Sequence, residues 1–109
     1  MNTLTNQTEA LVRLKIRDAF HAASIHFGAW RYLGDSCTTA EVEVASAQLD
    51  AILAALDEAE FAAAELAAIE SASEAAVQAA SGATVGVNML RETATLLSAQ
   101  LGWASEIAA

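Results

Sequence analysis

Apolar residues recur at steps of three and four along most of this chain, which is the spacing of one face of an α-helix. In the first third of the sequence the repeat is formed by Val12, Ile16, Ala19, Phe20, Ala23, Phe27 and Trp30. The repeat predicts a helix over about residues 5–33. Gly34 follows it, and glycine suits the left-handed position just beyond a helix C-terminus. We therefore expect the first helix to end at Leu33.

The same segment carries a second apolar strip, formed by Leu14, Ile25 and Tyr32. Polar residues separate the two strips, so this helix is predicted to contact neighbours on two sides. It is interpreted as the central helix of the fold or as the helix that joins two copies of the chain. Self-association through Leu14, Ile25 and Tyr32 would bury the surplus strip.

Capping signals mark where the next helices begin. Thr38 and Glu41 have the spacing of a capping box, in which each side chain bonds the backbone amide of the other residue. They predict the start of a second helix over about residues 39–70. Ser71 and Glu74 repeat this spacing and predict a tight connection followed by a third helix.

The third helix is predicted over about residues 73–106, where the apolar repeat continues without a slip. Gly82 and Gly86 lie inside it, and each costs about 1 kcal/mol relative to alanine in a helix interior. A break between Ser81 and Asn88 would divide this segment and give four helices. The unbroken repeat favours one continuous helix.

The composition supports an entirely helical fold. Proline is absent, and alanine, the strongest helix former, occurs 28 times in 109 residues. The three segments are each about 30 residues, or roughly 45 Å at 1.5 Å per residue, and the loops are short. This pattern predicts an all-α fold, an antiparallel up-down three-helix bundle of long alanine-rich helices in a single domain over 1–109. Because alanine buries little area, the core is expected to depend on its larger members: Phe20, Phe27, Trp30, Leu49, Ile52, Leu56, Leu90, Leu97, Leu101 and Trp103.

Charge is distributed unevenly. The net charge is -9, and no Lys, Arg or His lies between Tyr32 and Leu90, where ten carboxylates occur. Carboxylates of the predicted second helix form a candidate partner-binding face opposite the apolar repeat: Glu41, Glu43, Asp50, Asp57, Glu58 and Glu65. Such a face favours docking onto a basic protein surface.

Four basic residues precede the acidic block, namely Arg13, Lys15, Arg17 and Arg31. They are predicted to pair with the acidic residues of the second helix, either within the bundle or across a dimer. The net charge opposes the binding of a phosphate backbone, so no direct contact with nucleic acid is expected.

Candidate catalytic chemistry is sparse. Both histidines, His21 and His26, fall on the first predicted helix, so the Glu-x-x-His pairs of a di-iron bundle are missing. His26 lies beside the apolar stripe, where we expect a half-buried, hydrogen-bonded side chain. Cys37 has no nearby histidine to activate its thiol. We therefore expect no catalytic residue, no cofactor, no metal site and no enzymatic activity.

The cellular context is also indicated by the sequence. The longest uncharged stretch, residues 75–90, is too short and too polar to cross a membrane. No signal peptide is visible near the N-terminus, and a single cysteine fits a reducing compartment. The expected location is the cytoplasm, without a membrane partner.

These features predict a protein–protein interaction module that acts through its acidic face on a partner with a basic surface. By analogy in size and charge, that face would stand in for a nucleic-acid backbone and occlude a nucleic-acid-binding surface of a host defence complex, as anti-CRISPR proteins of phages and mobile elements do. The alternative is a self-associating structural or regulatory bundle, in which the acidic face serves solubility alone.

Overall fold

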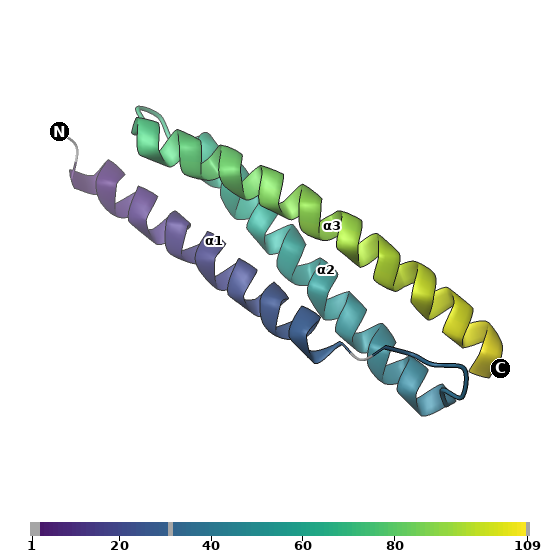
Figure 1. The fold of residues 1–109 in the computed structure, drawn as a ribbon. Coiled ribbons are helices and arrows are strands. Elements are labelled where there is room, and N and C mark those ends of the chain that lie inside the picture. The colour runs from purple at the N-terminus through teal and green to yellow at the C-terminus, as the bar shows by residue number, and fades with distance from the viewer. Residues whose placement is uncertain (1–2, 31, 109) are drawn as a thin grey trace.

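The computed structural model describes residues 3–30 and 32–108, which form three α-helices (Figure 1). These are α1 (Thr3–Ala29), α2 (Thr39–Ala67) and α3 (Glu74–Ala108). Successive helices run antiparallel, and the bundle is slender, with Cα extents of 60 × 18 × 16 Å. The prediction of an all-α, up-down three-helix bundle is therefore confirmed.

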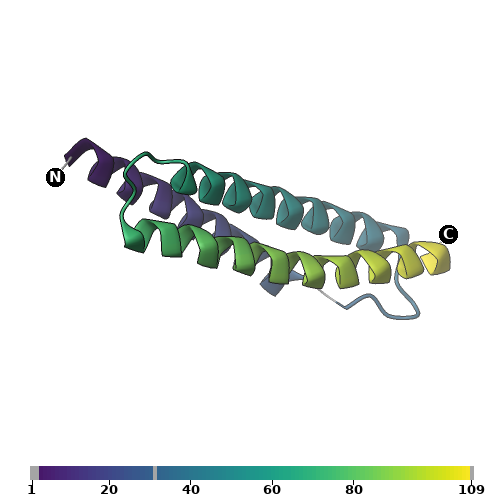
Figure 2. The ribbon, with the colours of Figure 1, turned by 90° about the horizontal axis from the view of Figure 1, so that it is seen from above.

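The central helix is α2, and the interpretation of α1 as central is wrong. α2 packs along its length against both neighbours, whereas the backbones of α1 and α3 approach each other at few points. Figure 2 shows the connection between α1 and α2 near the C-terminal end of α3, and the connection between α2 and α3 near the start of α1. Each connection therefore lies beside an end of the helix that it does not join.

Alanine lines the contacts that α2 makes with its neighbours. The predicted repeat of α2 is confirmed, and its buried residues are Ala45, Leu49, Ile52, Ala55, Leu56, Ala59, Ala62, Ala63 and Leu66. The repeat of α3 is confirmed by the burial of Ala76, Ala80, Ala83, Val87, Ala94 and Ala104. The largest fully buried side chains are Ile52, Leu56, Leu66, Val12 and Val87. Trp103 was expected in this core, but 40% of its surface is exposed.

α1 is shorter than predicted because Leu33, the expected last residue of the helix, is buried in the core after the helix has ended. It ends at Ala29, and the described residues 32–38 form a non-helical connection. Leu33 is 3% exposed and packs with Ala45 of α2 and Ala104 of α3. The chain must leave the helix to place Leu33 between them. The sequence predicted that Gly34 would cap α1 in a left-handed conformation. This prediction is wrong, because Gly34 does not adopt a positive φ.

α3 (Glu74–Ala108) is continuous through Gly82 and Gly86, so the four-helix alternative is wrong. A Cβ added at Gly86 would lie 3.1 Å from Cζ of Phe20, an aromatic side chain of α1. Glycine therefore admits the ring close to the axis of α3, and the resulting burial offsets its low helix propensity. A Cβ at Gly82 would meet no atom within 4 Å, and we find no structural reason for a glycine there.

The predicted capping box at the start of α2 is confirmed. The N–H of Glu41 donates to Oγ1 of Thr38 at 3.2 Å, and the N–H of Thr38 donates to Oε1 of Glu41 at 3.2 Å. Two amides at the helix start thus have acceptors, which stabilises α2 at its N-terminus.

The predicted capping box at the start of α3 is wrong, because the cap is Ser73. Its Oγ accepts from the N–H of Ala76 at 3.1 Å, whereas Ser71 adopts φ 60° in the turn that follows α2. Glu9 of α1 completes the cap: its carboxylate accepts from the N–H of Ser73 at 2.7 Å and from Ser73 Oγ at 3.0 Å. Glu9 is 7% exposed, and the positive end of the α3 dipole favours its charge.

Leu56→Ala tests the core between α2 and its neighbours. We expect it to lower the free energy of unfolding by about 2–5 kcal/mol, because it leaves a cavity around a fully buried position. Urea unfolding followed by circular dichroism measures the change. Leu11 of α1 is largely exposed, so Leu11→Ala is the control and should change stability by less than about 0.5 kcal/mol. Equal effects of the two substitutions would contradict the assigned core.

Gly82 and Gly86 of α3 should respond differently to replacement by alanine. Gly82→Ala is expected to raise the free energy of unfolding by about 0.5–1 kcal/mol, since it gains helix propensity in open space. Gly86→Ala should gain less or destabilise, because the new Cβ displaces the Phe20 ring. Thermal unfolding of both variants measures the difference. Identical gains would mean that the ring does not need this glycine.

Candidate functional site

The outward side of α2 carries five of the six carboxylates predicted to bind a partner. We refer to these five as the acidic face: Glu43, Asp50, Asp57, Glu58 and Glu65. Glu65 is half-buried and the other four are exposed. The first and last of them are 22 positions apart, or roughly 33 Å at 1.5 Å per residue. Because a helix fixes their spacing, the five charges form one elongated surface.

Glu41, the sixth predicted residue, does not lie on this face. It is nine residues from Asp50, which places it about half a turn away at roughly 100° per residue. Its carboxylate accepts from both the N–H and the hydroxyl of Thr38, so it belongs to the capping box. Glu41 lines a hollow beside the end of α1 together with Trp30 and Leu33.

An aromatic side chain stands among these carboxylates. Phe61 is 74% exposed and lies on the same side of α2 as Asp57, Glu58 and Glu65. These residues line a shallow groove between α1 and α2, whose α1 side includes Lys15. The sequence pattern did not predict Phe61 as a site residue, although its position four residues after Asp57 carried the signal. The groove offers a hydrophobic contact bordered by negative charge.

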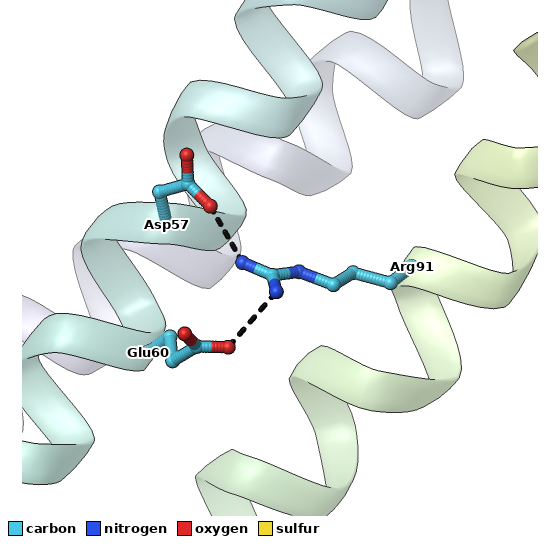
Figure 3. A network of polar contacts seen from close by, with 3 residues as sticks. All are labelled: Asp57, Glu60 and Arg91. Carbon is cyan, nitrogen blue, oxygen red and sulfur yellow. Dashed lines mark hydrogen bonds and ion pairs between the residues drawn. The ribbon is translucent and has the colours of Figure 1, made fainter.

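Arg91 of α3 neutralises part of the charge of α2. Figure 3 shows its guanidinium between two carboxylates of α2, those of Asp57 and Glu60. Nη2 contacts Asp57, and Nη1 lies 2.9 Å from Oε2 of Glu60. The side chain of Arg91 is about one third exposed, whereas those of Asp57 and Glu60 are mostly exposed, so these are surface ion pairs of modest strength. Arg91 thereby joins α3 to the edge of the acidic face.

The bases of α1 pair with the acidic face at one described point. Lys15 Nζ lies 3.6 Å from Oε2 of Glu65, so the predicted pairing within the bundle occurs there. Arg17 instead contacts its neighbour Asp18 at 3.4 Å. Arg31 lies outside the described residues, and Arg13 forms no ion pair with any residue that the structure describes.

Three members of the acidic face have no basic partner within residues 3–30 and 32–108: Glu43, Asp50 and Glu58. The surrounding protein therefore leaves their charges to solvent or to a partner. They lie at both the start and the middle of α2, so the unneutralised charge is distributed along the face. These three residues are the best targets for substitution, because no internal ion pair is lost.

The other candidate residues have structural contacts. Nδ1 of His26 lies 3.0 Å from Oε1 of Gln48, and the ring is half-buried, as predicted. The thiol of Cys37 contacts the carbonyl oxygen of Ala104 at 3.6 Å. Both contacts join α2 or the preceding connection to another helix. They hold the bundle together at the end where α1 stops.

The strip predicted for self-association is divided by the structure. Leu14 and Ile25 are exposed on the outer side of α1, with Asp18 between them. Tyr32 is 80% exposed but lies in the connection after α1, so it does not extend a helical strip. Whether these three residues mediate association stays a prediction.

A longer apolar strip lies on α3 and was not predicted. We call it the α3 strip, and it consists of Val85, Met89, Leu96, Trp103 and Ile107. Their steps of four, seven, seven and four residues place them on one side of the helix, away from the buried repeat. The sequence carries this signal as a second apolar repeat, which runs along the opposite side of α3 from the buried one. Leu96, at the middle of the strip, is 72% exposed.

Among the described residues, no group of three or more His, Cys, Asp or Glu side chains could hold a metal ion. Within the same residues, none of the helices combines the length and apolar character that crossing a membrane requires. Comparisons with protein families, curated proteins and solved structures find no match to this chain. Function is therefore inferred from the residues and their geometry.

Arg91→Gln tests the charge contact between α2 and α3. It leaves Asp57 and Glu60, three residues apart on one helix, as unneutralised like charges. We expect the free energy of unfolding to fall by about 0.5–1.5 kcal/mol at low salt and by less in high salt, because ions screen the pairs. Lys15→Gln removes one longer contact and should cost below about 0.5 kcal/mol. A loss that is independent of salt would indicate a packing role for Arg91.

Proposed function

We propose that the protein is a non-enzymatic interaction module that docks its acidic face onto a basic surface of a partner protein. The supporting observation is that Glu43, Asp50 and Glu58 project from one helix face without basic partners among the described residues. Such charges steer association, and because no internal ion pair neutralises them, they can attract the basic residues of a partner.

Phe61 adds an exposed hydrophobic side chain to the acidic face. A large aromatic side chain that is mostly exposed has an apolar area that a partner can bury, and aromatic residues are frequent hot spots of interfaces. The surrounding carboxylates would form the polar rim of such a contact. This combination favours docking over a role in solubility alone.

In its narrower form, the proposal is that the partner is a nucleic-acid-binding machine of host defence, which the protein occludes in the manner of a phage or mobile-element inhibitor. The five carboxylates of the acidic face are spread over roughly 33 Å, or about one per 7 Å, whereas duplex DNA carries one charge per about 1.7 Å. Occlusion would therefore act by covering the basic surface instead of by matching the charge density of a duplex. This proposal implies that the protein acts in the cytoplasm, where such a partner would be found.

A self-associating structural or regulatory bundle is the second candidate function. The exposed apolar residues Leu14 and Ile25 of α1, together with the α3 strip, favour it. Association through these surfaces is compatible with docking, because the acidic face lies on a different helix.

Affinity capture from a nuclease-treated lysate of the source organism tests the docking proposal. The captured proteins are identified by mass spectrometry for the wild type and for a variant that removes the unpaired charges without changing side-chain shape. This variant combines Glu43→Gln, Asp50→Asn and Glu58→Gln. We expect it to lose the partner at least about tenfold, with unchanged thermal stability, because these residues hold no internal ion pair.

A matched control separates the acidic face from net charge. It neutralises three exposed carboxylates elsewhere and combines Asp35→Asn, Glu70→Gln and Glu106→Gln. It should retain the partner, whereas Phe61→Ala should weaken capture with all charges in place. Equal loss in both triple variants would contradict a specific role of the acidic face. A captured partner that still binds its nucleic acid in the presence of the protein would contradict occlusion.

A further inference from the structure

The α3 strip contains five exposed large hydrophobic residues, more than the described residues of α1 or of α2 contribute. Its five residues extend from Val85 to Ile107, or roughly 33 Å at 1.5 Å per residue. Arg91, which contacts α2, lies about 140° around the helix from Leu96 at roughly 100° per residue. The strip therefore points away from the other two helices. No described residue of this chain covers it.

The charge of α3 indicates which kind of molecule can bind the strip. Between residues 75 and 105 its charged residues are Arg91 and Glu92, so this stretch has no net charge. The whole net charge of -9 is carried by the rest of the chain. Two copies of an acidic protein therefore repel each other only weakly along α3, whereas a basic partner is steered to α2. Binding on an anionic lipid surface would need lysine or arginine beside the apolar strip, and Arg91 faces α2.

The strip is also self-complementary. When two α3 helices are aligned antiparallel with Leu96 opposite its own copy, Val85 faces Ile107 and Met89 faces Trp103. The polar residues follow the same symmetry, since Glu92 then faces Gln100. The side-chain oxygen of Gln100 accepts from Nε1 of Trp30, which leaves its amide hydrogens for the carboxylate of Glu92. A two-fold interface requires this kind of pairing.

The exposed residues of α1 do not form an equivalent surface. Asp18 interrupts the line between Leu14 and Ile25, and exposed Arg13 and Arg17 flank it. An antiparallel two-fold contact that pairs Leu14 with Ile25 would place the charged Asp18 next to its axis, and burying this carboxylate would cost affinity. The charge pattern thus favours α3 over the strip predicted from the sequence.

We propose that two copies of this chain associate through the α3 strip as an antiparallel, two-fold symmetric dimer with Leu96 at its axis. The flat footprint is about 33 Å by 10 Å, or roughly 330 Å² per copy, compared with about 800 Å² per partner in a standard stable interface. The dimer is therefore weak and forms reversibly with concentration. This inference rests on self-association, the second candidate function, and is independent of the partner proposed for the acidic face, which stays exposed in the dimer.

Sedimentation equilibrium over about 5–500 μM protein tests association. The average mass of the wild type should rise toward twice the monomer mass. Leu96→Glu places two carboxylates together at the axis and should abolish this rise without changing helicity or thermal stability, because Leu96 is exposed. Leu14→Glu makes the same chemical change on α1 and should dimerise like the wild type. A wild type that stays monomeric throughout, or a dimer lost in Leu14→Glu and kept in Leu96→Glu, would overturn the proposal.

Disulfide trapping tests the register. In a Cys37→Ser background, Leu96→Cys should form a cross-linked dimer under mild oxidation, because the two-fold axis brings the two thiols together. Val85→Cys should not cross-link to itself but should cross-link to Ile107→Cys when the two proteins are mixed. Self-cross-linking of Val85→Cys at the rate seen for Leu96→Cys would indicate a parallel pair and overturn the antiparallel arrangement.

Discussion

The close approach of α2 to both neighbours is the constraint on which the rest of the molecule depends. Alanine on the facing surfaces, such as Ala59, Ala63 and Ala80, permits this approach but contributes little buried area per residue. The helices compensate with length, since a contact of many small residues must be long to be stable. Bulk is supplied by a few buried side chains of α2, chiefly Ile52 and Leu56, and by the Phe20 ring seated against Gly86. A slender bundle is the result, with much of each helix facing outward.

Each helix consequently has an outer side with its own chemistry. The outer side of α2 is acidic with one aromatic residue, that of α1 mixes bases with isolated leucine and isoleucine, and that of α3 is apolar and nearly uncharged. Ion pairs cross the boundaries between these sides at Lys15 and Arg91, and the described part of the chain supplies no basic partner to the rest of the acidic face. Such one-sided surfaces are features that a binding partner can recognise.

Local periodicity was sufficient to predict the helices, the buried repeats of α2 and α3 and the cap formed by Thr38. It failed where a distant residue decides the local structure. Gly34 signalled a helix end, but the burial of Leu33 against α2 and α3 ends α1 earlier. Glu9 caps α3 across 64 residues of sequence, which no local motif reveals. The alanines beside the repeat of α2 were a signal for its central position. Glu41 lies nine residues from Asp50, which places it about half a turn around the helix, so the sequence also contained the information that excludes Glu41 from the acidic face.

The carboxylate of Glu9 also has a consequence for the order of folding. It completes the N-terminus of α3 only after α1 and α3 have come together at that end of the bundle. Because a contact between residues so far apart in sequence closes a long loop, we expect it to form after the neighbouring helices have paired. Interactions absent from the folding transition state slow unfolding with little effect on the rate of folding. Glu9 is thus expected to set how long the native bundle persists, more than how fast it forms.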